Sequence, residues 1–350
     1  MNEKNKKNIL DYSSSSVSIN EIIEIINKEF GEGTVTTLGK ISNNRENVIS
    51  SGSIFLNNAM GTGGYVRGKI VEIFGLESSG KSTLALQAVN ECQKKNGKVA
   101  YFDLENGLDR EYAKKIGIEI DDLMIFYPDS GEKVFDMMKN LIRGNIDLII
   151  VDSVSNLIPF SQLDSNLEKQ KIGSQALLMS SGLRRLKNEL ISDKNLKNTV
   201  IIFINQIRNK ISTGFYLGNP ETTSGGMALR FDSDLRIKLK KRGFIEKEDN
   251  DEVIGIKVEA EIIKNKLAAP GKTADIEIFF SKGIKKEREI FHLAVKLEII
   301  EKSGNWYSYL DKKIGNGKEN SILFLENNFS IYEEIENKVI KEIKNNKLFF

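Results

Sequence analysis

The sequence predicts an α/β protein in which helices flank a mostly parallel central sheet. Between residues 69 and 205, hydrophobic runs of strand length alternate with helical stretches, which is the order expected of βαβ units. After Gly226, apolar and polar residues alternate, as in antiparallel strands with one exposed face. Beyond Gly283 the chain is rich in lysine and glutamate with helical periodicity, which indicates a small α+β C-terminal domain.

The N-terminal region contributes one amphipathic helix. Isoleucines and a phenylalanine recur at helical spacing from Ile19 to Phe30, with Ser18 as the expected N-cap and the end near Gly31. Its apolar stripe needs a partner, either the chain's own core or a neighbouring subunit. We therefore expect three segments: a tail and small N-terminal helix region for oligomerisation at 1–42, a core at 43–285 and the C-terminal domain at 286–350.

The core elements follow in order along the chain. Strands are expected at residues 69–74, 98–105, 147–153 and 198–205, and helices at 81–95, 110–116 and 174–191. The strand at 147–153 contains an unbroken run of Leu, Ile and Val, which suits burial on both faces of a sheet. Later strands are expected at 235–241, 252–263 and 274–280.

Composition narrows the function classes. The 350 residues carry 51 Lys and Arg against 49 Asp and Glu, a net charge of +2, so any affinity for nucleic acid must come from local patches. Cys92 is the single cysteine, which excludes intrachain disulfides and is typical of a reducing compartment. His292 is the single histidine, which argues against histidine metal clusters and a Ser-His-Asp triad. With no apolar run near the roughly 18 residues of a membrane span and no secretory h-region, we expect a cytoplasmic protein without a membrane partner.

The most specific motif is the run GLESSGKS, which fits G-x-x-x-x-G-K-[ST]. Its glycines let backbone N–H groups wrap around phosphate oxygens, and the helix that follows adds its positive N-terminal end. Lys81 is expected to neutralise the β- and γ-phosphates and the Ser82 hydroxyl to bind Mg²⁺. A glycine- and serine-rich turn would explain the composition alone, but this run follows a predicted strand and opens a predicted helix. The predicted nucleotide-binding residues of this P-loop NTPase core are Gly75, Leu76, Glu77, Ser78, Ser79, Gly80, Lys81, Ser82 and Thr83.

Two carboxylates at strand ends complete a hydrolytic site. Asp152 closes the strand at 147–153, where an acidic residue orients Mg²⁺, usually through water; alone it would suit a helix cap equally well. Asp103 and Glu105 are two residues apart, hence on the same side of an extended chain. Glu105 lies furthest out, so we expect it to be the catalytic carboxylate; a solvated strand-end acid is the alternative.

A lone amide, Gln206, stands between the end of a buried strand and a small basic cluster with Arg208 and Lys210. A strand-end glutamine that faces water is the ordinary interpretation. Its place beside the predicted γ-phosphate position favours a residue that senses nucleotide instead, since an amide can bind phosphate before hydrolysis and lose that bond afterwards.

The order of motifs resembles one family, the bacterial RecA recombinases, from about Ile19 to Lys344. The resemblance rests on EFGEGTV, VEIFGLESSGKST, DLENGLD, IIVDSV, FINQIR, GNPETTSGGMALRF, IKNKLAAP and EKSGNWYSY. It implies an ATP-dependent enzyme that forms helical filaments on single-stranded DNA, exchanges strands with homologous double-stranded DNA and hydrolyses ATP. It also implies co-protease activity in the SOS response, with a repressor undergoing self-cleavage as a further partner.

The resemblance also assigns roles to residues outside the phosphate loop. Asp109 and Tyr112 would contact the adenine, and Phe280 stands where the family usually has tyrosine. Lys264 and Lys266 would reach across the filament interface to the neighbouring subunit's ATP, which makes the active site shared. The resemblance likewise supports the sensor role of Gln206.

DNA would bind to two loops, at about 160–173 and 209–225. The expected DNA-binding residues are Arg184, Arg185, Arg208, Lys210, Gly225 and Gly226. Several positions depart from the family: the first loop lacks two glycines, Leu177 replaces an arginine, Arg230 replaces a lysine, and NNKLFF lacks an acidic tail. These departures bear on DNA contact and regulation, whereas the nucleotide motifs are intact.

Two alternatives stay open at the level of sequence. An ATPase of the same core could act as a ring helicase or a protein-remodelling factor, although FINQIR and GNPETTSGG disfavour it. A divergent filament protein could bind ATP and DNA yet exchange strands poorly, as the altered first loop suggests.

Overall fold

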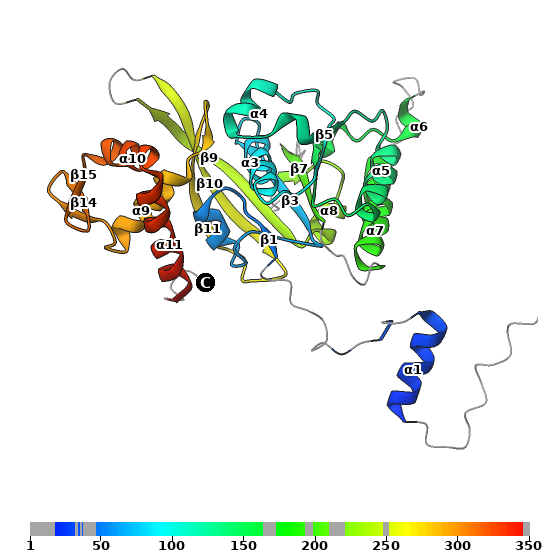
Figure 1. Ribbon diagram of the computed structural model, residues 1–350. Coiled ribbons are helices and arrows are strands. Elements are labelled where there is room, and N and C mark those ends of the chain that lie inside the picture. Colours follow the sequence, from blue (N-terminus) through cyan, green and yellow to red (C-terminus); the bar gives the residue numbers. More distant parts are fainter. Residues whose placement is uncertain are drawn as a thin grey trace, which may run out of the picture. The chain divides into compact units, whose positions relative to one another are not determined.

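The computed structural model describes residues 18–31, 34, 35, 37, 47–163, 173–192, 199–209, 221–247 and 252–345 (Figure 1). The chain divides into two compact units, Met1–Asn43 and Asn44–Phe350, which are considered separately. In the first unit, helix α1 spans Ile19–Phe30. The Ser18 side chain accepts from the backbone N of Glu21 and the Glu21 carboxylate accepts from the backbone N of Ser18, so the predicted N-cap is a full capping box. No residue of α1 is buried.

The second unit is built on a ten-stranded sheet with the order β12-β11-β10-β9-β3-β7-β6-β4-β5, and β8 pairs with β7 beside it. The neighbours from β9 to β5 run parallel, whereas β10, β11 and β12 are antiparallel, which confirms the mostly parallel prediction. The strands are β3 (Ile70–Gly75), β4 (Val99–Asp103), β5 (Leu123–Phe126), β6 (Leu148–Asp152), β7 (Val200–Asn209), β8 (Glu221–Thr223), β9 (Leu235–Glu246), β10 (Val253–Asn265), β11 (Thr273–Phe279) and β12 (Gly283–Ile284).

Helices cover both faces of this sheet (Figure 1). Side chains of α3 and α4 pack in one hydrophobic cluster, and those of α5 and α7 pack in a second. Along β6, Ile150 belongs to the first cluster and Ile149 and Val151 to the second, so this strand is buried on both faces as its composition predicts. The helices are α2 (Ile54–Ala59), α3 (Lys81–Gln93), α4 (Arg110–Ile116), α5 (Gly131–Arg143), α6 (Phe160–Leu163), α7 (Ser174–Ser192) and α8 (Ala228–Asp232); β1 (Val48–Ile49) and β2 (Tyr65–Val66) pair separately.

The C-terminal region has a hydrophobic core of its own. It combines α9 (Lys286–Lys296), α10 (Lys318–Asn327) and α11 (Phe329–Asn345) with the small sheet β13 (Glu301–Ser303), β14 (Trp306–Tyr309) and β15 (Lys312–Asn316). The buried Glu289 carboxylate of α9 accepts hydrogen bonds from the Ser53 hydroxyl and from the backbone N of Ile54 and Phe55 at the start of α2. Burial raises the pKa of Glu289 to about 7 despite these donors. Among the described residues, no helix is both long and apolar enough to cross a membrane.

Two strand ends beside the predicted site differ from the prediction. Strand β4 stops at Asp103, whose buried carboxylate turns back to accept from the backbone N of Gly107 and Leu108. Asp103 and Glu105 therefore do not share one side of an extended chain: the expectation was wrong because a turn begins between them. Strand β7 continues through Gln206 to Asn209, because its last residues pair with β8 after the second loop. The βα unit formed by β5 and α5 was not predicted, and neither were the short elements β1, β2, α2, α6, β8 and β12.

Candidate nucleotide and DNA site

The phosphate loop leaves the sheet between two parallel neighbours. In register, Gly75 at the end of β3 lies opposite Gln206 of β7 and Leu239 of β9. A Cβ on Gly75 would stand 2.5 Å from the Leu239 carbonyl oxygen and 2.7 Å from Ser79 Oγ, so only glycine fits. Gly80, with φ +88°, is the N-cap of α3 and offers no side chain to the helix. The first N–H groups of α3 are thus left for an anion, which is the arrangement that a phosphate requires.

Lys81 is held inside this loop. Its side chain is largely buried, and Nζ donates to the Leu76 carbonyl oxygen at 2.7 Å. Burial lowers the pKa of Lys81, whereas the nearby Asp152, Glu105 and Glu77 raise it. An ammonium that is short of solvent and bonded to a neutral carbonyl gains much from a phosphate placed at the same point.

Asp152 joins the loop to the neighbouring strand β6. Its Oδ2 accepts from Ser82 Oγ at 2.7 Å and from the Tyr101 hydroxyl at 2.8 Å. Burial raises the pKa of Asp152, although both hydrogen bonds oppose this shift. A carboxylate and a hydroxyl are hard oxygen donors, and Mg²⁺ uses few protein ligands together with phosphate and water. The oxygen donors of the Ser82–Asp152 pair therefore fit Mg²⁺ carried by a nucleotide. The described ranges hold no group of three or more His, Cys, Asp or Glu able to bind a metal.

Glu105 and Gln206 meet beside this pair. Glu105 Oε1 accepts from the Ser153 hydroxyl and from Gln206 Nε2, the latter at 3.1 Å. The two side chains come from the residues after β4 and from β7, the strands on either side of β6 in the sheet. The structure thus brings the predicted catalytic carboxylate and the predicted sensor into direct contact.

The predicted adenine contacts lie on two separate elements. Asp109 caps α4, where its Oδ1 accepts from the backbone N of Glu111 and Tyr112. The Tyr112 hydroxyl lies 3.1 Å from Thr83 Oγ1, which ties α4 to the phosphate loop, and burial raises the pKa of this tyrosine. Phe280, directly after β11, is 52% exposed and therefore available to a flat ring.

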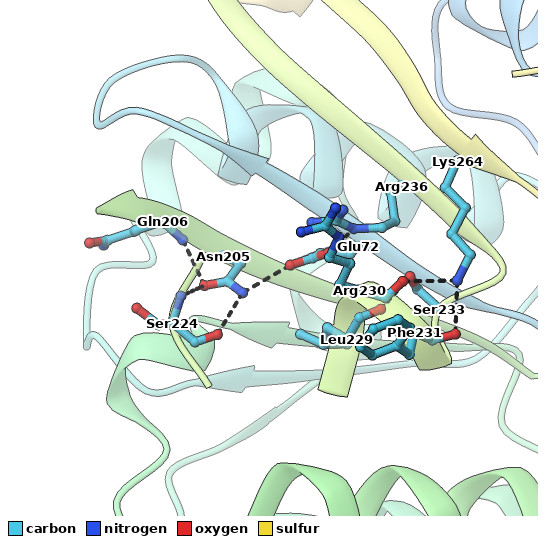
Figure 2. A network of polar contacts seen from close by, with 10 residues as sticks. All are labelled: Glu72, Asn205, Gln206, Ser224, Leu229, Arg230, Phe231, Ser233, Arg236 and Lys264. Carbon is cyan, nitrogen blue, oxygen red and sulfur yellow. Dashed lines mark hydrogen bonds and ion pairs between the residues drawn. The ribbon is translucent and has the colours of Figure 1, made fainter. Parts of the chain in front are cut away.

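Lys264 and Lys266 are engaged elsewhere. Lys264 Nζ donates to the carbonyl oxygens of Arg230 and Phe231 at the end of α8, at 2.9 and 2.8 Å (Figure 2). Lys266 Nζ lies 3.4 Å from Asp234. Within the described part of the chain, neither ammonium hydrogen-bonds to the phosphate loop.

Comparison with known proteins covers nearly the whole chain. Residues 17–285 match the RecA N-terminal domain and residues 288–344 match the RecA C-terminal domain. The chain belongs to the RecA family. Protein RecA of Phytoplasma mali is 42% identical over 343 residues, 98% of this chain and 99% of that protein. The RecA proteins of Rickettsia prowazekii (47% identity, 91% of each chain) and Mycoplasma mycoides (46%, 94% of this chain and 92% of that protein) are similarly related.

RecA membership establishes the function in outline. The activity is ATP-dependent strand exchange in recombination and repair, carried out by a DNA-dependent ATPase. Membership likewise implies ATP binding, DNA binding and filament formation. It decides against the ring-helicase and remodelling alternatives.

The structure describes only the ends of the two predicted DNA loops. Arg184 and Arg185 are exposed on α7. Gly225 and Gly226 have φ of +78° and +73° and pack against α7: a Cβ on Gly226 would stand 2.8 Å from the Cβ of Ala176. The side chain of Arg208, the residue Lys210 and most of both loops (164–172 and 210–220) lie outside the described residues.

The sequence did not reveal one polar cluster that lies next to the predicted nucleotide site. Glu72, Asn205 and Arg236 come from β3, β7 and β9, and all three are buried (Figure 2). Arg236 Nε donates to Glu72 Oε2 at 2.5 Å, and Asn205 Nδ2 donates to Glu72 Oε1 at 2.9 Å. The available signal was a charged or amide residue inside each of three expected strands, two of them otherwise hydrophobic.

Proposed function

We propose that this RecA protein hydrolyses ATP with Mg²⁺ at a site completed by the neighbouring subunit of a filament on DNA. The observation that carries this proposal is the convergence of Glu105, Gln206 and the Ser82–Asp152 pair beside the phosphate loop, through contacts at 2.7–3.1 Å. ATP with Mg²⁺ supplies the phosphoryl group whose transfer to water drives the cycle.

Each side chain of the loop has a distinct task. Lys81 exchanges its carbonyl contact for the β- and γ-phosphates, and the amides of the loop and of α3 surround the phosphate oxygens. Ser82 and Asp152 would hold Mg²⁺, which would neutralise charge on the phosphates when it is bound. Glu105 accepts the proton of the attacking water, with Ser153 holding the carboxylate in place.

Assembly supplies the remaining charge. Lys264 and Lys266 serve the neighbouring subunit's ATP, as the family resemblance implies, so hydrolysis depends on subunit contact. Helix α1 provides oligomerisation surface, because Ile19 and Phe30 are 69% and 68% exposed and an apolar stripe is stable only when it is covered. The segments 1–42, 43–285 and 286–350 thus act as oligomerisation region, ATPase core and C-terminal domain.

Gln206 connects hydrolysis to DNA. Its amide already contacts Glu105, and β7 continues from it into the second DNA loop. A γ-phosphate would compete for that amide, so loss of the phosphate shifts the start of the loop. Arg184, Arg185, Arg208 and Lys210 neutralise DNA phosphates, and the amides of Gly225 and Gly226 add neutral donors.

The decisive experiment measures ATP hydrolysis with and without single-stranded DNA across a range of protein concentration, with Mg²⁺ titrated. We expect a rate that rises steeply with concentration, requires Mg²⁺ and increases on DNA. A rate per subunit that stays the same at all concentrations would contradict the shared site. Homologous pairing with double-stranded DNA then tests whether the altered first loop weakens strand exchange. Co-protease activity toward a repressor stays a prediction of the resemblance, to be checked by repressor cleavage with the assembled filament.

A further inference from the structure

We propose that Asn205, oriented by Glu72, is a positioning residue that joins the nucleotide sensor to the return arm of the second DNA loop. This inference rests on the sensor role of Gln206 proposed above. Neither Asn205 nor Glu72 is expected to touch ATP or DNA. Both are fully buried, and Asn205 directly precedes the proposed sensor Gln206 in β7 (Figure 2).

The oxygen and the nitrogen of the Asn205 side-chain amide each make two hydrogen bonds. Its Oδ1 accepts from the backbone N of Gln206 at 2.9 Å and from the backbone N of Ser224 at 3.2 Å. Its Nδ2 donates to Glu72 Oε1 at 2.9 Å and to the carbonyl oxygen of Ser224 at 3.0 Å. One side chain therefore holds the backbone of the sensor and both backbone polar groups of Ser224.

Ser224 is the base of the loop's return arm. It follows β8 directly, and β8 pairs with the end of β7 through Ile207–Thr223 and the two pairs beyond. The Asn205 side chain acts as one further rung of this ladder, at the point where the strands diverge. The Ser224 hydroxyl has no hydrogen-bond partner among the described residues, which leaves the backbone contacts with Asn205 as the polar contacts that fix Ser224.

Glu72, together with the backbone groups of Gln206 and Ser224, fixes which way the Asn205 amide faces. A carboxylate only accepts, so it requires the Nδ2 end, while the two backbone N–H groups require the Oδ1 end. A flipped amide would place donors against donors and oxygens against oxygens at all four contacts. The second Glu72 oxygen is occupied by Arg236, whose guanidinium also lies over the Phe74 ring at 4.5 Å from its centroid.

The cluster of Glu72, Asn205 and Arg236 does more than stabilise the fold. A buried ion pair is at best weakly stabilising compared with apolar residues of the same size. What the pair does provide is a fixed acceptor for Asn205, three residues before the phosphate loop begins at Gly75. When Gln206 shifts with the state of the nucleotide, Ser224 must move with it, because both are bonded to the same amide. The two arms of the DNA loop therefore respond as one unit.

The test uses the ratio of the dissociation constants for single-stranded DNA in ADP and in a slowly hydrolysed ATP analogue. Asn205→Ala removes all four contacts and leaves a small cavity; we expect this ratio to fall about tenfold, the effect of losing one hydrogen bond to a charged group. Asn57→Ala is the matched control. The Asn57 amide also holds a turn, through the backbone N and hydroxyl of Ser51 and the hydroxyl of Ser50, and its loss should leave the ratio unchanged.

Exchanging the amide and the carboxylate between positions 72 and 205 distinguishes a positioning role of Asn205 from a simple loss of fold stability. Asn205→Asp places two carboxylates against each other and should abolish the nucleotide dependence. In the double variant Glu72→Gln/Asn205→Asp, the new amide can donate to the new carboxylate while still accepting from Arg236, so the ratio should recover in part. Such recovery is a coupling that a merely destabilised fold would not show. Should Asn205→Asp fail to fold, Asn205→Ala and the double variant still test the positioning role of Asn205.

Hydrogen exchange gives a second readout. In the unmodified chain, amides at 221–226 should be better protected with the ATP analogue than with ADP, and Asn205→Ala should remove that difference. If the unmodified chain itself shows no nucleotide dependence of DNA affinity, the sensor function and this inference are both overturned. If the unmodified chain shows it and Asn205→Ala retains it, the sensor function stands and the role of Asn205 is refuted.

Discussion

The two halves of the proposed ATPase site differ in how far one chain completes them. The phosphate-loop half is assembled internally: Lys81, Ser82 and Glu105 each already hydrogen-bond to a neighbour within the site. The lysine half is not, since Lys264 donates to two carbonyl oxygens of α8 and Lys266 lies beside Asp234. If the proposed shared site is right, a single subunit is prepared to bind nucleotide, whereas fast turnover requires a neighbour.

The largest loss of ATP turnover is expected when Lys81, in the phosphate-loop half, is removed. Lys81→Ala deletes the one buried ammonium of the first half, so turnover should fall to background, a loss of more than about a thousandfold. The measurement is steady-state phosphate release on single-stranded DNA. Lys94→Ala, an exposed lysine paired with Glu91, serves as the control and should hydrolyse normally. Appreciable turnover without Lys81 would refute the phosphate-loop assignment.

Glu105→Gln tests whether binding and chemistry are separable within that half. The amide keeps the size of the side chain but accepts a proton poorly, so we expect turnover to drop about a thousandfold while filaments still form with ATP. Phosphate release and electron microscopy of filaments on DNA check the two parts. Rapid turnover in this variant would move the catalytic role to another group.

The shared site can be tested by mixing two inactive chains. Lys264→Ala should lower turnover about a hundredfold, by loss of one charge at the transition state. In an equal mixture with Glu105→Gln, about a quarter of the head-to-tail interfaces would pair an intact Glu105 with an intact Lys264. Activity should then rise well above that of either variant alone. A mixture no more active than its components would place Lys264 outside the neighbour's site.

The pH dependence of the Mg²⁺ requirement for hydrolysis tests the assignment of Asp152. Because burial raises the pKa of this carboxyl, it takes up a proton at higher pH than an ordinary aspartate, whose pKa is about 3.9. The Mg²⁺ concentration for half-maximal hydrolysis should therefore increase as the pH is lowered, before ordinary aspartates titrate. Asp152→Asn should lack this component, which separates it from protonation of the nucleotide. Identical profiles for the two proteins would mean that Asp152 is not involved.

The smallest effect is expected at the DNA face. Arg184→Ala should reduce the slope of log affinity for single-stranded DNA against log salt by about 0.7, the value of one phosphate contact. Fluorescence anisotropy at several salt concentrations measures it. Lys133→Ala, an exposed lysine paired with Asp129, should leave the slope unchanged. Equal slopes for Arg184→Ala and the unmodified chain would remove this residue from the interface.

Sequence predicted those features that depend on local pattern. The phosphate loop, the N-cap Ser18 and the doubly buried strand β6 follow from spacing and composition within a few residues. Contacts between distant segments did not follow, because nothing local encodes them: Glu72 and Asn205 are 133 positions apart. The end of β7 was misplaced for the same reason, since its last residues are strand only because β8 returns to pair with them.

The continuation of β7 past Gln206 has a mechanical consequence. Three further residues, at about 3.3 Å each, form an arm of roughly 10 Å that projects from the edge of the central sheet. Hydrogen bonding to β8 makes this arm a stiff ribbon instead of a single strand. A small rotation at its root is therefore enlarged at its tip, where the second DNA loop begins. If Gln206 senses the γ-phosphate as proposed, the loss of that one contact becomes a larger displacement at the base of the predicted DNA loop.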